Sequence, residues 1–129
     1  MYSSLISVGL GAVLGAWLRW GISLRFNHYL GNIAFGTVLV NLIGAFIVGY
    51  AISLFATSSL NPNLKLFLLT GFCGALTTFS TFSIEVVTLL QEGKFKYAIL
   101  TIAIHVIGSL FFTLLGIAAY QLTSSAYST

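Results

Sequence analysis

Long apolar runs without charged residues are the feature that most constrains this chain. The stretch from about Ile33 to Ala56 contains no charged side chain, and the whole sequence is 58% hydrophobic and 5% charged. A soluble domain carries roughly a quarter charged residues, whereas a membrane-spanning helix needs about 20 predominantly apolar residues. The sequence therefore predicts an all-α integral membrane protein. Its 129 residues hold about four spans and no sizeable soluble domain.

Polar and turn-forming residues separate the predicted spans. We place the four spans of a single transmembrane domain, residues 1–129, at about 4–26, 33–56, 63–90 and 97–122. Asn61 is expected to cap the third span, with Pro62 in its first helical turn. Gly93 and the lysines beside it form the short connection to the fourth span.

The charged residues are few, and most lie near the predicted span ends. Five basic and two acidic residues give a net charge of +3, too little for a nucleic-acid surface, so no nucleic-acid partner is expected. Arg25, Lys94 and Lys96 fall on one side of the membrane and Lys65 on the other. The positive-inside rule favours the first side as cytoplasmic, but an excess this small leaves insertion in both orientations open.

Polar residues within the spans are costly and mark a protein interior or a water-filled path. In the second span, Thr37 and Asn41 share one helical face. In the fourth span, His105, Ser109 and Thr113 recur at four-residue spacing and form one polar stripe. For any single hydroxyl the commoner role is an interhelical hydrogen bond. Two stripes on two helices nevertheless favour a polar path.

Residues 74–83, GALTTFSTFS, place five hydroxyls and two phenylalanines inside the third span. Gly71 and Gly74 weaken a helix, and Ser and Thr compete for backbone hydrogen bonds, so we predict that the third helix is broken near its middle. A break frees backbone groups that bind ions where they face protein or water. Phe79 and Phe82 would turn the positive edges of their rings toward a bare anion. Ordinary lipid or core contact is the alternative for both rings.

The sequence contains no catalytic constellation. It has no Ser-His-Asp set, paired catalytic carboxylates, phosphate-binding glycine loop or HExxH motif, and its acids are Glu85 and Glu92. We therefore expect a protein that is not an enzyme. A small four-helix proton-coupled multidrug exporter is one alternative function, for which Glu85 is the only candidate membrane carboxylate. A structural membrane subunit is another.

The segment GFCGALTTFSTFSIE, residues 71–85, closely resembles the Fluc (CrcB-like) fluoride channel family. The likeness extends to GAVLGAWLRW in the first span and FGTVLVNLIGAF in the second. The resemblance implies an antiparallel, dual-topology homodimer with two pores, which carries fluoride passively across the inner membrane of a microbial cell to relieve fluoride toxicity. It also implies a structural sodium ion at the dimer interface. The implied partners are fluoride ions, the lipid bilayer and a second copy of the chain.

The resemblance also assigns individual residues. The implied anion pore consists of Phe79, Phe82, Asn41, Ser80, Ser109, Thr113, His105 and Thr37. Backbone carbonyls of Gly74 and Thr77, from both subunits, would hold the sodium ion, and Arg19 would lie near the vestibule. Two positions depart from the family pattern. Ala75 stands where the family often has a second glycine, and His105 where some relatives have tyrosine.

Overall fold

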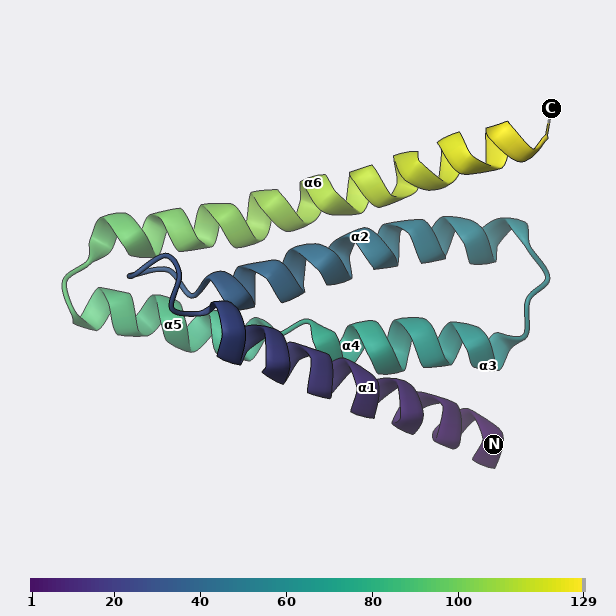
Figure 1. Cartoon of the computed structure of the whole chain (residues 1–129), viewed down its shortest axis with the longest axis horizontal. Helices are drawn as coiled ribbons and strands as arrows, with labels where there is room; N and C mark the ends of the chain where they lie inside the picture. Colours follow the sequence, from purple (N-terminus) through teal and green to yellow (C-terminus); the bar gives the residue numbers. More distant parts are fainter. Residues whose placement is uncertain (129) are drawn as a thin grey trace.

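The computed structural model describes residues 1–128, which form helices joined by short connections (Figure 1). The elements are α1 (Tyr2–Phe26), α2 (Phe35–Thr57), α3 (Pro62–Lys65), the π-helical segment η1 (Leu66–Cys73), α4 (Gly74–Leu76), α5 (Phe79–Gln91) and α6 (Phe95–Tyr127). Four stretches are long and apolar enough to cross a membrane: 2–26, 35–57, 62–91 and 95–127. The predicted all-α membrane class and the number of spans are confirmed.

The connections follow from local chemistry. Asn61 Oδ1 accepts a hydrogen bond from the amide of Asn63 at 2.9 Å, and Pro62 occupies the start of α3, as predicted. Gly31 and Gly93 have φ angles of 64° and 73°, in the left-handed region that favours glycine. These two glycines lie in the α1–α2 and α5–α6 connections, so both tight turns are encoded locally.

α6 is longer than the predicted fourth span and continues to Tyr127. The segment after Leu122 contains neither glycine nor proline, so no local signal ends the helix there. At a rise of about 1.5 Å per residue, its 33 residues reach roughly 50 Å, whereas the hydrocarbon core is about 30 Å thick. α6 therefore extends beyond the hydrocarbon region or crosses it at a tilt.

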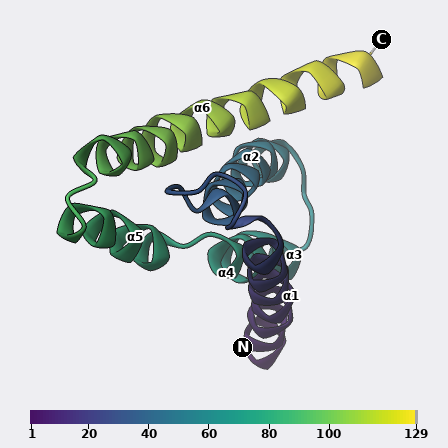
Figure 2. The same ribbon diagram turned by 60° about the vertical axis from the view of Figure 1, so that its left-hand side comes forward.

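α2 occupies the middle of the bundle. Both views place α2 between α6 and the segment formed by α3, η1 and α4, and α1 packs against η1 and α4 (Figures 1 and 2). α5 leaves the line of α4 and packs against α6 (Figure 2). The start of α1 and the end of α6 lie at the end of the bundle where α2 connects to α3 (Figure 1). The junction between α4 and α5 is thereby brought near α2 and α6.

Glycines bring neighbouring helices to backbone contact. A Cβ atom at Gly49 would lie 2.1 Å from the Thr113 carbonyl oxygen, and one at Gly11 would lie 2.1 Å from the Phe67 carbonyl oxygen. These separations are too short for any side chain, so the first contact fixes α2 against α6 and the second fixes α1 against η1. Small residues at close helix crossings are typical of membrane bundles.

Candidate functional site

Two residues with extended backbones separate α4 from α5. Thr77 has φ −84° and ψ 156°, and Thr78 has φ −151° and ψ 116°. In a continuous helix the Thr78 amide would donate to the Gly74 carbonyl. It donates instead to Asn41 Oδ1 of α2 at 2.8 Å. A side chain from a neighbouring helix thus replaces a backbone partner.

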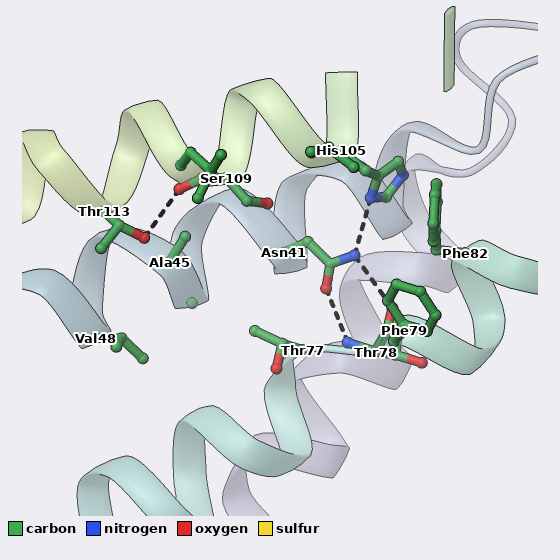
Figure 3. Close-up of a pocket in the computed structure, with 13 residues that line it drawn as sticks. Asn41, Ala45, Val48, Thr77, Thr78, Phe79, Phe82, His105, Ser109 and Thr113 are labelled. Atoms are coloured by element: carbon green, nitrogen blue, oxygen red, sulfur yellow. Dashed lines mark hydrogen bonds between the residues drawn. The ribbon is translucent and has the colours of Figure 1, made fainter. Parts of the chain in front are cut away.

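The Asn41 side chain pairs with both polar backbone groups of Thr78. Besides accepting from the Thr78 amide, it donates from Nδ2 to the Thr78 carbonyl at 3.2 Å (Figure 3). Because an amide N–H can only donate, the atom facing it must be the Asn41 oxygen, which fixes the orientation of the side-chain amide. Nδ2 also lies 2.9 Å from His105 Nδ1. This nitrogen must therefore accept, which places the proton of the neutral ring on Nε2.

Hydroxyls satisfy the backbone where α5 begins. Thr78 is the N-cap residue of α5, and its Oγ1 accepts a hydrogen bond from the Thr81 amide at 3.2 Å. It also lies 3.4 Å from Ser80 Oγ, whose side chain is exposed. On the other side of the junction, Thr77 Oγ1 donates to the Cys73 carbonyl at 2.9 Å. The hydroxyls of Thr77 and Thr78 thus pair backbone groups on the two sides of the junction.

Three carbonyls at the junction have different surroundings. The Ala75 carbonyl accepts from Arg19 Nε at 2.9 Å. The Thr81 amide, which would reach the Thr77 carbonyl in a continuous helix, is bound to the N-cap hydroxyl instead. The carbonyls of Gly74 and Thr77 therefore lack their usual helical donors, and Arg19 binds the carbonyl next to Gly74.

A cavity of about 440 Å³ opens beside this junction, between α2, α5 and α6 (Figure 3). Its lining residues are Asn41, Gly44, Ala45, Val48, Thr77, Thr78, Phe79, Phe82, His105, Val106, Ser109, Leu110 and Thr113. The lining contains amide, hydroxyl and imidazole groups and aromatic rings, but no Asp, Glu, Lys or Arg. The cavity is therefore mostly apolar, carries a few polar groups and has no fixed charge.

The structure brings six of the sequence-predicted pore residues to this cavity. Phe82 is buried, and its ring centroid lies 4.6 Å from that of His105. The Phe79 ring lies 5.4 Å from Phe82 at 60°, yet Phe79 is 78% exposed in the single chain. Ser109 and Thr113 lie farther along α6, where Thr113 Oγ1 donates to the Ser109 carbonyl at 2.9 Å. Asn41 completes the set.

Thr37 lies outside this cavity and is fully buried. Its hydroxyl donates to Glu85 Oε1 at 2.6 Å, and its amide donates to Asn27 Oδ1 at 3.1 Å. Glu85 and Thr101 line a second cavity of about 270 Å³ beside the α5–α6 connection. The sequence contained a signal for Thr101, because it lies four residues before His105 and extends the polar stripe of α6 by one turn.

Four apolar helical stretches, with a cavity between α2, α5 and α6 that has no charged side chain in its lining, define a small multi-pass membrane protein. The model of the family described as CrcB-like protein, Camphor Resistance (CrcB), matches residues 6–117. The chain belongs to this CrcB-like family.

Curated relatives match almost the full chain. A protein of Acinetobacter baumannii (strain AYE) is 63% identical over 120 residues, covering 93% of this chain and 95% of the relative. A protein of Acinetobacter baylyi is 60% identical over 121 residues, covering 94% and 96%. One of Pseudomonas putida (strain W619) is 52% identical over 125 residues, covering 96% and 98%. Each of the three is named a fluoride-specific ion channel, FluC.

Proposed function

We propose that this chain forms a fluoride-selective passive channel in the bacterial inner membrane. By exporting fluoride, the channel relieves the toxicity of fluoride to the cell. The observation that carries this proposal is the uncharged cavity at the α4–α5 junction, which presents weak hydrogen-bond donors and aromatic rings. Relatives at 52–63% identity are named fluoride-specific ion channels, which supports the same function and a protein that is not an enzyme.

The lining suits a small anion that has lost part of its water. Fluoride binds water strongly, so a pore must offer replacement donors, such as the hydroxyl of Ser109 and the positive edges of Phe79 and Phe82. A lysine or arginine in the same place would hold the ion too tightly for rapid release. Weak, neutral donors therefore permit both entry and exit.

The proposed working unit is an antiparallel homodimer with two pores. Phe79 lines the cavity yet is 78% exposed in the single chain, so the cavity wall is incomplete there. A two-fold related copy would place identical α4–α5 junctions opposite each other and cover this ring. The small excess of basic residues on one side is compatible with insertion in both orientations.

The proposed sodium site uses the carbonyls of Gly74 and Thr77 from both copies. Each carbonyl has lost its helical donor, because the Thr78 amide binds Asn41 and the Thr81 amide binds an N-cap hydroxyl. Oxygen ligands of this kind, freed by a helix interruption, suit a hard cation. If the site forms, sodium should raise the unfolding temperature of the purified protein above its value in N-methylglucamine. Equal unfolding temperatures would exclude a structural sodium ion.

Ion efflux from proteoliposomes tests the proposed function. Vesicles that contain the purified protein should release fluoride rapidly and chloride hardly at all. The fluoride rate should not change when a proton ionophore collapses any proton gradient, because a passive channel has no coupled proton. Equal release of both halides would overturn the selectivity, and a rate that depends on the proton gradient would indicate exchange.

The alternative of a proton-coupled multidrug exporter is not favoured. It requires a membrane carboxylate that exchanges a proton for a cationic drug. Glu85 is the only such group in the spans, but its Oε1 is bonded to Thr37 and it does not line the larger cavity. Drug transport by the wild type that is abolished in Glu85→Gln would support the exporter.

A further inference from the structure

Three buried polar atoms on α5 and α6 have no hydrogen-bond partner within residues 1–128. They are Glu85 Oε2, Thr101 Oγ1 and His105 Nε2. Thr101 is 1% exposed and His105 is 5% exposed. Buried polar groups are nearly always hydrogen-bonded, so three orphans in one region indicate a ligand.

These atoms come from adjacent positions on two helices. Thr101 and His105 lie one turn apart on the same face of α6. Glu85 lies one turn after Phe82 on α5, and the Phe82 ring packs on the His105 ring. Glu85 and Thr101 line the smaller cavity, whereas His105 lines the larger one. Thr101 and His105 are thus one turn apart on α6 but line different cavities.

The donor and acceptor pattern distinguishes between small ligands. His105 Nε2 carries the ring proton, because Nδ1 accepts from Asn41, so it offers a donor. Glu85 Oε2 is the second oxygen of a carboxyl group whose Oε1 already accepts from Thr37, and in the ionised carboxylate it offers an acceptor. The Thr101 hydroxyl can do either. A bare halide only accepts hydrogen bonds, so it would face the carboxylate oxygen unfavourably, whereas a water molecule suits all three groups.

We propose that Glu85, Thr101 and His105 form a binding site for an ordered water molecule that joins the two cavities into one hydrated path. The water accepts from His105 Nε2, donates to Glu85 Oε2 and bonds to the Thr101 hydroxyl. Its role in conduction rests on the proposed function: a fluoride ion that leaves the aromatic part of the larger cavity regains water at this point. Figure 3 shows the nitrogen of His105 that is free for this contact on the side of the ring away from Asn41.

Solid-state NMR tests the water site without any measurement of transport. The chain contains two histidines, His28 and His105. His28 is exposed in the α1–α2 connection and serves as an internal reference. In proteoliposomes with ¹⁵N-labelled histidine, magnetisation should pass from water to the buried His105 Nε2–H. Thr101→Val should reduce this transfer several-fold and leave that to His28 unchanged. Absence of transfer in the wild type, or full transfer in Thr101→Val, would overturn the proposal. Loss of transfer when fluoride is added to the wild type would show an anion site instead and would also overturn it.

Fluoride efflux tests the role in conduction. Thr101→Val should lower the rate at least fivefold, and Thr101→Ser, which keeps the hydroxyl, should restore most of it. Thr123→Val is the matched control, because the Thr123 hydroxyl on the same helix also makes hydrogen bonds, to the Tyr120 carbonyl at 3.0 Å and with the Tyr50 hydroxyl at 3.2 Å, but lies outside both cavities. If the wild type conducts fluoride and Thr101→Val conducts it at the same rate, the role of the water in conduction is refuted. A wild type that does not conduct fluoride would refute the proposed function and leave the NMR result to decide the site.

Discussion

Asn41 binds the backbone of Thr78 at both of its polar groups, with hydrogen bonds of 2.8 and 3.2 Å. The side-chain amide thus takes the place of a neighbouring peptide at a point where the helix provides none. The same amide reaches His105 at 2.9 Å. One residue of α2 therefore links the α4–α5 junction to α6 and sets the spacing of three walls of the larger cavity.

Asn41→Asp should disrupt this link. The substitution keeps an oxygen for the Thr78 amide but replaces the Nδ2 donor with a second oxygen, which would face the Thr78 carbonyl and His105 Nδ1. An unsatisfied buried group costs about 1–3 kcal/mol, so the unfolding temperature should fall, and fluoride efflux should fall at least tenfold. Asn63→Asp is the control, because Asn63 Oδ1 accepts from the Ser4 hydroxyl near the bundle end and an aspartate keeps this acceptor. Wild-type efflux in Asn41→Asp would contradict the proposed role.

Replacing either aromatic ring should suppress fluoride efflux. Phe79→Ile and Phe82→Ile each remove ring edges from the cavity, and the proposed dimer should stay assembled in gel filtration. Phe82→Ile should also destabilise the fold by about 1–3 kcal/mol, because Phe82 is only 8% exposed. Phe111→Ile, at an exposed ring of α6 outside the cavity, should conduct normally. Normal efflux in both cavity variants would refute the pore role of the rings.

Gly49→Ala should force α2 and α6 apart. The added methyl would lie 2.1 Å from the Thr113 carbonyl oxygen, which belongs to a helix backbone and cannot rotate away. Overpacking of this kind costs about 1–3 kcal/mol, and the wider spacing should reduce fluoride efflux or its selectivity over chloride. Gly9→Ala is the matched control, because a Cβ atom there has no neighbour within 4 Å. Equal thermal stability and efflux for the two variants would show that the contact between α2 and α6 does not limit the cavity.

Arg19→Leu should weaken the end of α4. Arg19 Nε donates to the Ala75 carbonyl at 2.9 Å, and this hydrogen bond is partly buried. Its loss is expected to lower the free energy of unfolding by about 1 kcal/mol. This corresponds to a fall of a few degrees in unfolding temperature, measured in detergent. Arg25→Leu, at an exposed arginine one to two turns later, is the control. An unchanged unfolding temperature in Arg19→Leu would show that the hydrogen bond contributes nothing.

The sequence by itself determined the class of the protein and the number of spans. Apolar runs, Pro62 and the turn glycines act over a few residues, so their effect can be read locally. The same local reasoning placed Asn41, Phe82 and His105 on the faces that line the larger cavity. From Gly71, Gly74 and the hydroxyls it also predicted a break near the middle of the third helix, which stays a prediction; Thr77 and Thr78 have extended backbones in this segment.

Only the tertiary structure decided which polar groups meet. The Thr78 amide binds a residue 37 positions away, and Thr37 lies against Glu85 rather than in the larger cavity. The tertiary structure also brings Thr101 and Glu85 together in the lining of a second cavity. Helical periodicity gives the face on which a side chain lies, but not the height and rotation of one helix against another. Close glycine contacts between helices set both, and such contacts depend on residues far apart in the chain.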